Sequence, residues 1–350
     1  MLLFKRDYFA NPKIKWKKVN DKIFSNYLKK NLKISQSDNL QVYKNLGLEK
    51  NSNNYKLSYK KKLYMLKSIN LDSSKKKSEI KKMIILLNWL KKNKSLVPEP
   101  MTFKNGDFLM NFKEKNWLLS TYMEGNHFLG EKKEFYNVVK NMCLTTKLLR
   151  KYRDKKNLKF HNVSVSNLNK IITLMNKNRK RWINFFGKKQ SKYLKKYWGK
   201  INNIIFNLRL INYKNKKLEL VHVDIHPHNI ITRKNKLISF LDSESWMMSS
   251  VQEAFAYGGF KLCRQVILKN KNKKFVNNIG NEYINLIKKF YDKNYNLNKK
   301  ILLMCEKVIL ERIVNIFKFN LINNEKKWND LLPILLRHLD EVKIVFNNSK

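Results

Sequence analysis

Cysteine is scarce in this 350-residue sequence, and its three copies lie far apart. Cys143, Cys263 and Cys305 each fall in an apolar segment with helical spacing. Thiols in such positions are typical of reduced, buried side chains, whereas small secreted proteins carry dense sets of paired cysteines. The sequence therefore excludes a disulfide scaffold, and we expect a cytoplasmic protein.

Long apolar runs are also missing. The opening stretch, MLLFKRDYFANPKIKWKK, holds no apolar segment of signal-peptide length, and no run approaches the roughly 18 apolar residues of a transmembrane helix. There is no internal repeat and no long low-complexity linker. Because 43% of the residues are hydrophobic, the chain can bury a large core, and we expect a folded protein without a membrane span.

Acidic residues are few: the chain has 26 Asp and Glu and 75 Lys and Arg, which gives a formal net charge of +49. Such a balance is typical of proteins that bind nucleic acid or an anionic membrane surface. The lysines, however, are spread over almost every segment together with Asn and Ile, as the codon bias of an AT-rich genome would produce. Nucleic-acid binders usually gather charge on one face, so we prefer codon bias as the explanation and keep the functional interpretation as the alternative.

The most informative stretch, LELVHVDIHPHNIITRKNKLISFLDSES, covers positions 218–245. It predicts an apolar strand, a polar loop with Asp224 and Asn229, a hairpin with strands at 230–232 and 237–241, and Asp242 where the hairpin ends. Two carboxylates and one amide should therefore converge at one end of a small sheet.

Phosphoryl transfer needs such a set. One Asp accepts the proton of the attacking hydroxyl, while an Asn and a second Asp hold magnesium ions that neutralise the transferring phosphate. His222, Asp224 and Asn229 keep the spacing of the protein-kinase loop H-R-D-x-x-x-x-N, and Asp242 follows across the hairpin.

The form His-x-Asp-x-His-Pro-x-Asn, followed by Asp-x-Glu, resembles the aminoglycoside phosphotransferase and choline kinase type of small-molecule kinases. This resemblance implies an ATP-dependent enzyme with Asp224 and His222 as catalytic residues and Mg²⁺ held by Asn229 and Asp242. The sequence departs from the family at His228, where Gly is common, and at Ser243, where an aromatic residue is common.

Two other interpretations of the same stretch stay open. His222, His226 and His228 could join Asp224 in a zinc site, provided that alternating side chains of an extended segment converge on one metal. The stretch could also be a core strand followed by a polar turn. Nothing structural requires Asp, Asn and Asp at these offsets together, so we prefer the catalytic interpretation.

The N-terminal third reads as strands at 42–69 followed by a helix at 78–93. In kinases a loop between the first two strands covers the ATP phosphates and is rich in Gly, but here positions 51–54 are Asn, Ser, Asn and Asn. Lys67, inside an apolar strand, occupies the position of the kinase phosphate lysine. Glu79, the only acidic residue of the following helix, is the expected ion-pair partner of Lys67, or else part of a solvated first turn.

A further strand, NWLLSTY, runs into the expected hinge between two lobes. By resemblance to the small-molecule kinases, Tyr122, Met123 and Glu124 would line the adenine site just before Gly125. An ordinary strand end and turn is the alternative.

From Glu131 onward the spacing of apolar residues predicts helices, at 131–153, 166–186, 191–212, 250–269, 274–292, 299–321 and 330–346. Gly258 and Gly259 are expected to interrupt one of them, and Pro333 to kink or start another. The whole predicts an α+β, two-lobed, protein-kinase-like fold, with a nucleotide-binding lobe at 1–125 and a catalytic and acceptor-binding lobe at 126–350.

Our first hypothesis for the function is an ATP-dependent kinase that phosphorylates a hydroxyl of a small molecule, such as a sugar or an amino alcohol. The alternative is a catalytically weak kinase-fold protein that binds nucleic acid or a membrane surface. The acceptor is expected to be neutral or anionic, because the positive field of the protein would repel a polycation.

Overall fold

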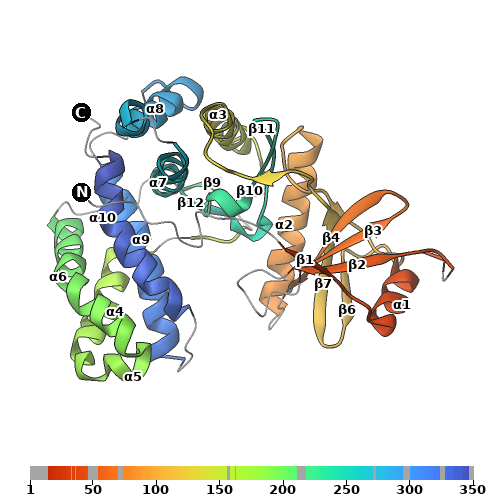
Figure 1. The fold of residues 1–350 in the computed structure, drawn as a ribbon, viewed down its shortest axis with the longest axis horizontal. Helices are drawn as coiled ribbons and strands as arrows, with labels where there is room; N and C mark the ends of the chain where they lie inside the picture. Colours follow the sequence, from red (N-terminus) through yellow and green to blue (C-terminus); the bar gives the residue numbers. More distant parts are fainter. Residues whose placement is uncertain are drawn as a thin grey trace.

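The computed structural model describes residues 15–32, 34–35, 37–45, 54–69, 74–155, 158–161, 163–210, 218–270, 273–294, 300–323 and 328–346. Figure 1 shows an antiparallel sheet with one helix at its far end, joined through α2 to a mainly helical part. Positions 51–53 of the expected phosphate loop lie outside the described residues.

Among the described residues, the N-terminal sheet has seven strands in the order β1-β2-β3-β4-β7-β5, with β6 also pairing with β7. Its strands are β1 (Trp16–Lys18), β2 (Gln41–Asn45), β3 (Asn54–Tyr59), β4 (Lys62–Ile69), β5 (Pro100–Met101), β6 (Leu109–Phe112) and β7 (Lys115–Thr121). All pairs are antiparallel, and β3 turns into β4 through Lys60 and Lys61, which both have positive φ. Two such residues make the turn that matches the twist of a hairpin.

One face of this sheet is covered by α1 (Lys22–Asn31), whose first turn is capped by the Asp21 side chain. Phe24 and Leu28 on α1 pack with Leu57, Leu66 and other residues of the sheet in a small separate core. Helix α2 (Ser74–Lys92) instead contributes Ile80, Ile84, Leu87 and others to the large core of the helical part. The predicted helix at 78–93 is thus confirmed, with one more turn at its start.

Two small sheets lie at the junction. One consists of β8 (Asn126–His127), β10 (Ile230–Arg233) and β11 (Lys236–Phe240), and the other of β9 (Leu218–His222) and β12 (Trp246–Ser250). The turn between β10 and β11 has Lys234 and Asn235 at positive φ, as the hairpin prediction requires. The strand β12 was not predicted from the sequence, because its five residues show no alternation of apolar and polar side chains.

The crossing from the sheet to the helical part is pinned by Glu134, a buried residue of α3 (Lys132–Leu149). Its Oε2 accepts hydrogen bonds from the backbone N–H groups of Leu129, Gly130 and Glu131 at 2.9–3.2 Å, and Oε1 accepts one from Thr232 Oγ1 on β10. The start of α3 is therefore fixed to the hairpin that precedes Asp242.

The helical part also contains α4 (Val165–Lys177), α5 (Trp182–Phe186), α6 (Lys188–Leu210), α7 (Val251–Lys269), α8 (Lys273–Phe290), α9 (Ile301–Leu321) and α10 (Leu332–Phe346). The expected helix at 166–186 is wrong as a single element, because the chain breaks at Asn178 into a short 3-10 turn, η2 (Arg179–Arg181), before α5. Pro333 lies in the first turn of α10, where its missing N–H costs nothing.

The prediction for Gly258 and Gly259 is wrong, since α7 runs through both without interruption. A Cβ at Gly258 would lie 3.2 Å from the Cβ of Ile225, and a Cβ at Gly259 would lie 2.2 Å from the Tyr283 ring. These glycines allow α7 to approach the loop after β9 on one side and α8 on the other.

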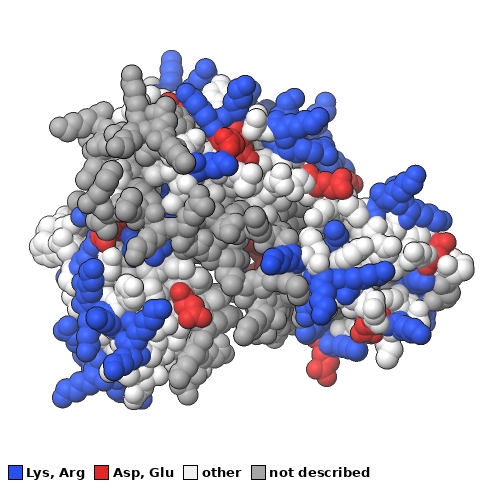
Figure 2. All heavy atoms as spheres, viewed as in Figure 1, with Lys and Arg blue, Asp and Glu red and all other residues white. Residues whose placement is uncertain are grey.

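The three cysteines are buried and unpaired, as expected. Within the residues that the structure describes, no helix combines the length and the apolar character needed to cross a membrane. Figure 2 shows basic side chains over both the sheet part and the helical part on this face, with acidic side chains in smaller groups. This spread fits the scattered lysines of the sequence.

Candidate active site

The predicted carboxylates and amide meet in the loops after β9 and β11. Asp224 follows β9, Asn229 ends the short 3-10 turn η3 (Pro227–Asn229), and Asp242 follows β11. Asn229 Nδ2 donates to the backbone oxygen of Asp224 at 2.9 Å, and the Asn229 backbone oxygen accepts from the N–H of Leu241 at 2.8 Å. The two loops are therefore joined through Asn229.

Asp242 adopts a left-handed backbone conformation, with φ 57° and ψ 68°. Residues other than Gly seldom adopt this conformation, although the short polar side chain of Asp tolerates it. It starts the 3-10 turn η4 (Ser243–Ser245), and Ser245 Oγ donates to Asp242 Oδ2 at 2.6 Å. The local turn thus fixes the direction of the Asp242 carboxylate.

Lys67 reaches this carboxylate from β4. Its Nζ lies 3.2 Å from Asp242 Oδ1 and 3.3 Å from Glu244 Oε1. Burial by itself would raise the pKa of Asp242, but the charge of Lys67 and the hydrogen bond from Ser245 outweigh it and lower this pKa below its ordinary value. Burial would likewise lower the pKa of Lys67, and the two carboxylates raise it instead.

Glu79 does not pair with Lys67 in the structure. It is half-buried on the first part of α2, and within the described residues the ion pairs of Lys67 are those with Asp242 and Glu244. The expected pair is thus replaced, because two carboxylates from the turn after β11 already surround the ammonium group. Glu244, the last residue of the Asp-x-Glu pattern, was not among the predicted site residues.

His222 is almost fully buried, and the chain itself uses both of its ring nitrogens. Nε2 lies 2.8 Å from the backbone oxygen of Leu241, and Nδ1 accepts from the backbone N–H of Asp224 at 3.3 Å. Burial lowers the pKa of His222, so the ring is neutral at pH 7. The ring of Trp246 packs edge-on against it with centroids 4.8 Å apart. In this geometry His222 holds the loop of Asp224 against the loop of Asp242.

Asp224 has an unpredicted partner, Arg312 on α9. Arg312 Nη2 lies 2.7 Å from Asp224 Oδ1, and the guanidinium stacks on the Tyr257 ring at 4.4 Å. On the other side, His226 Nε2 lies 3.6 Å from Asp224 Oδ2. Burial would raise the pKa of Asp224, but the charges of Arg312 and then His226 hold it well below its usual range. Sequence reasoning missed Arg312 because 88 positions separate it from Asp224.

The zinc interpretation finds no support in this geometry. The ring centroids of His226 and His228 lie 5.6 Å apart, and those of His228 and His127 lie 5.9 Å apart. Across the described part of the chain, no group of three His, Cys, Asp or Glu side chains is arranged to hold a metal ion. The ring of His222 is turned into the loop, so the alternating histidines do not converge.

The expected hinge follows β7 directly. Tyr122 N–H donates to the backbone oxygen of Leu63 at 3.2 Å, and the Tyr122 ring meets Trp16 edge-on at 6.1 Å. Tyr122 and Met123 are half-buried and Glu124 is exposed. At Gly125 a Cβ would lie 2.4 Å from the backbone oxygen of Thr232, so only glycine allows the chain to pass this close to β10.

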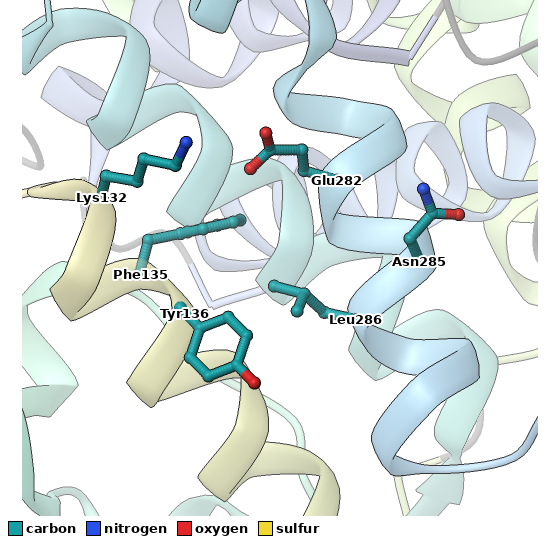
Figure 3. A pocket seen from close by; sticks show the side chains of 6 residues that line it. All are labelled: Lys132, Phe135, Tyr136, Glu282, Asn285 and Leu286. Atoms are coloured by element: carbon teal, nitrogen blue, oxygen red, sulfur yellow. The ribbon is translucent and has the colours of Figure 1, made fainter.

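A hollow of about 200 Å³ lies elsewhere, between α3 and α8 (Figure 3). Its lining comes from Lys132, Phe135, Tyr136, Glu282, Asn285 and Leu286. None of the predicted site residues borders it, so the carboxylate cluster and this hollow are separate features.

Comparison with known proteins agrees with the geometry. The model of the phosphotransferase enzyme family (APH) matches residues 46–257. A search of curated proteins finds no match.

Several solved structures share the fold at low identity. The amicoumacin kinase hAmiN, in complex with AMP-PNP, Ca²⁺ and Ami, is 10% identical, with a TM-score of 0.64 over 93% of each chain. The spectinomycin phosphotransferase APH(9)-Ia, in complex with ADP and spectinomycin, is 13% identical, with a TM-score of 0.61 over 94% of this chain and 98% of that one. The choline kinase of Cryptosporidium parvum is 14% identical, with a TM-score of 0.53 over 94% and 99%.

The fold is therefore the two-lobed kinase-like α+β fold that the sequence predicts, and the family match covers more than half of the chain. The chain belongs to the phosphotransferase enzyme family.

Proposed function

We propose that this protein is an ATP-dependent kinase that transfers the γ-phosphate to a hydroxyl of a small molecule. The observation that carries the proposal is the ion pair between Lys67 of the sheet and Asp242 of the C-terminal part, beside Asp224 and Asn229. A cation and two carboxylates converge here from both sides of the hinge. Such an arrangement suits a nucleotide bound between the two parts.

The residues present fit a magnesium site. Mg²⁺ prefers oxygen ligands, and the Asp242 carboxylate and the Asn229 side-chain oxygen would supply them. No hydrogen bond to Asn229 Oδ1 is found among the described residues, whereas Asn229 Nδ2 is held by the loop, which leaves the oxygen available. When bound, Mg²⁺ neutralises charge that develops on the transferring phosphate.

Asp224 would orient the acceptor hydroxyl and receive its proton as the oxygen bonds to the γ-phosphorus and the bond to the ADP oxygen breaks. The lowered pKa of Asp224 makes it a weak base. A weak base suffices because the transition state of phosphoryl transfer is loose, and the hydroxyl loses its proton late. Positioning is then the main contribution of Asp224.

The other predicted residues receive roles in the same proposal. His222 is a positioning residue that holds the two catalytic loops together. Lys67 would contact the nucleotide phosphates, and Tyr122, Met123 and Glu124 would line the adenine site. Glu79 would be the ion-pair partner of Lys67 in the nucleotide-bound protein, in which Asp242 would hold Mg²⁺.

We further propose the division into a nucleotide-binding lobe at 1–125 and a catalytic and acceptor-binding lobe at 126–350. The separate core under the N-terminal sheet supports it, although α2 packs into the large core. A cytoplasmic location is proposed from the unpaired, buried cysteines. The acceptor is proposed to be neutral or anionic, given the excess of 75 basic over 26 acidic residues.

The test is the Asp224→Asn variant in an assay of ADP release over a panel of hydroxyl compounds. Because the change is nearly isosteric, the fold should stay intact while turnover falls by about a hundredfold to ten-thousandfold. Asp107→Asn, at an exposed turn residue, is the matched control and should keep full activity. Activity of the Asp224 variant within a few-fold of the parent would remove Asp224 from the mechanism.

A further inference from the structure

Arg312 reaches Asp224 from the helical part of the molecule. Lys67, Asp242 and Glu244 form the side of the site that faces the N-terminal sheet. Arg312 belongs to α9, and Tyr257, on which it stacks, belongs to α7, so both come from the helical part. Because the nucleotide would occupy the Lys67 side, a hydroxyl that approaches Asp224 from the opposite side brings its neighbouring groups to Arg312.

The guanidinium has hydrogen-bonding capacity left over. The guanidinium has five N–H groups on three nitrogens, and the hydrogen bond it makes among the described residues runs from Nη2 to Asp224 Oδ1. Nε is buried and has no hydrogen-bond partner in the described part of the chain. The side chain as a whole is 32% exposed, and because Nε is buried, a ligand would have to reach the Nη end of the fork. A planar fork of this kind matches a carboxylate or phosphate with two parallel hydrogen bonds.

The nearby buried carboxylates are already engaged by other side chains of the protein. Lys307, five residues before Arg312 on α9, lies 2.9 Å from Glu253 Oε2 and also pairs with Glu311. His161 Nε2 lies 3.2 Å from the other oxygen of Glu311. Glu253 and Glu311 are therefore engaged in a buried network. A cationic acceptor would meet the guanidinium of Arg312 without these carboxylates to receive it.

We propose that Arg312 binds an anionic group, a carboxylate or a phosphate, that the acceptor carries close to its reacting hydroxyl. The preferred acceptor is then a hydroxy acid or a phosphorylated polyol. This inference rests on the proposed kinase function. It restricts the acceptor, proposed above to be neutral or anionic, to anionic compounds. Asp224 keeps Oδ1 on Arg312 while the hydroxyl meets the carboxylate, and the anion takes the unused donors.

The experiment compares pairs of open-chain acceptors in which one member carries an anionic group that the other lacks. Gluconate is paired with glucitol, D-glycerate with glycerol, and glycerol 3-phosphate with glycerol, each with MgATP in an assay of ADP release. The ratio of kcat/KM for the anionic to the neutral member is the readout. We expect a ratio of about 10 to 100, which is the usual effect of hydrogen bonds to a charged group. The carboxylate and phosphate arms identify which anion is preferred.

Two variants assign the preference to Arg312. Arg312→Gln should reduce the ratio to near 1, mainly through KM of the anionic member, and Arg312→Lys should keep part of it, because the charge remains and the fork is lost. Arg209→Gln, at an exposed position on α6, removes the same charge elsewhere and should leave the ratio unchanged. Circular dichroism checks that each variant is folded.

Other results would overturn the inference. The inference is wrong if the parent protein has the same kcat/KM for both members of each pair. It is also wrong if Arg312→Gln lowers kcat equally for the anionic and the neutral member. Arg312 would then serve to hold Asp224. Calorimetric titration with gluconate and glucitol, in the presence of AMP-PNP and Mg²⁺, tests the anion site without turnover. If gluconate binding depends on Arg312 but no acceptor leads to ADP release, the anion site is supported and the proposed kinase function is contradicted. If gluconate binding does not depend on Arg312, the anion site is contradicted.

Discussion

The ammonium of Lys67 lies 3.2 Å from the Asp242 carboxylate, although 175 positions separate the two residues in the chain. With Asp242 fixed by its left-handed backbone and by Ser245, this contact ties the N-terminal sheet to the catalytic loops. In the proposed function the same lysine would contact the nucleotide phosphates. The ion pair between Lys67 and Asp242 therefore has a structural role and a proposed chemical role.

Replacing Lys67 by Met should impair the use of ATP far more than it impairs folding. The pair is partly exposed, and such pairs contribute little stability, but the nucleotide phosphates would lose a charge partner. We expect kcat/KM for ATP to fall by about 10- to 1,000-fold. Lys62→Met, at an exposed position of the same strand, is the control. Steady-state kinetics with varied ATP would contradict this role if the two variants behaved alike.

Removal of the metal ligands should weaken nucleotide binding only when magnesium is present. Asp242→Ala should have the larger effect, because it removes a full charge, and Asn229→Ala the smaller one. Isothermal titration with AMP-PNP, with and without Mg²⁺, separates the two contributions. A parent protein whose nucleotide affinity does not change with magnesium would exclude the proposed metal site.

Gly259→Ala should destabilise the protein, because the new Cβ would lie 2.2 Å from Cε1 of Tyr283. Overpacking of this kind costs about 1–3 kcal/mol. Gly199→Ala is the matched control: it also lies in a helix, α6, but a Cβ there meets nothing within 4 Å. That change should be neutral or should stabilise by up to about 1 kcal/mol, since Ala favours helix more than Gly. Urea unfolding of both variants would refute the packing argument if their midpoints moved equally.

Stability should fall as the pH drops below 6.5. Burial, together with the charge of His226, lowers the pKa of His127 to about 4, so the folded protein keeps this ring neutral where the unfolded chain binds a proton. Protonation of this residue in the unfolded chain therefore lowers the free energy of unfolding by up to about 3 kcal/mol between pH 6.5 and 4. His222, whose pKa is also lowered, acts in the same direction.

The His127→Gln variant tests this assignment. The free energy of unfolding, measured in urea at several pH values, should depend less steeply on pH in the variant than in the parent. Equal slopes would place the sensitivity on other groups.

The sequence alone determined the local parts of this protein. Asp224, Asn229 and Asp242 fall within 19 positions, and a strand, a loop and a tight hairpin are enough to bring them together. Such elements depend on neighbouring residues, so their spacing can be interpreted directly. The helices of the C-terminal part were visible for the same reason, through the periodicity of their apolar residues.

Tertiary structure alone decided the partners of these residues. Arg312 has no recognisable spacing to Asp224, and Glu244 came to Lys67 in place of Glu79. Gly259 reads as a helix breaker in the sequence, yet it is the place where α7 meets Tyr283 of α8. Each of these contacts depends on how separate helices pack and on which charge is nearest after packing, and local patterns carry no information about either.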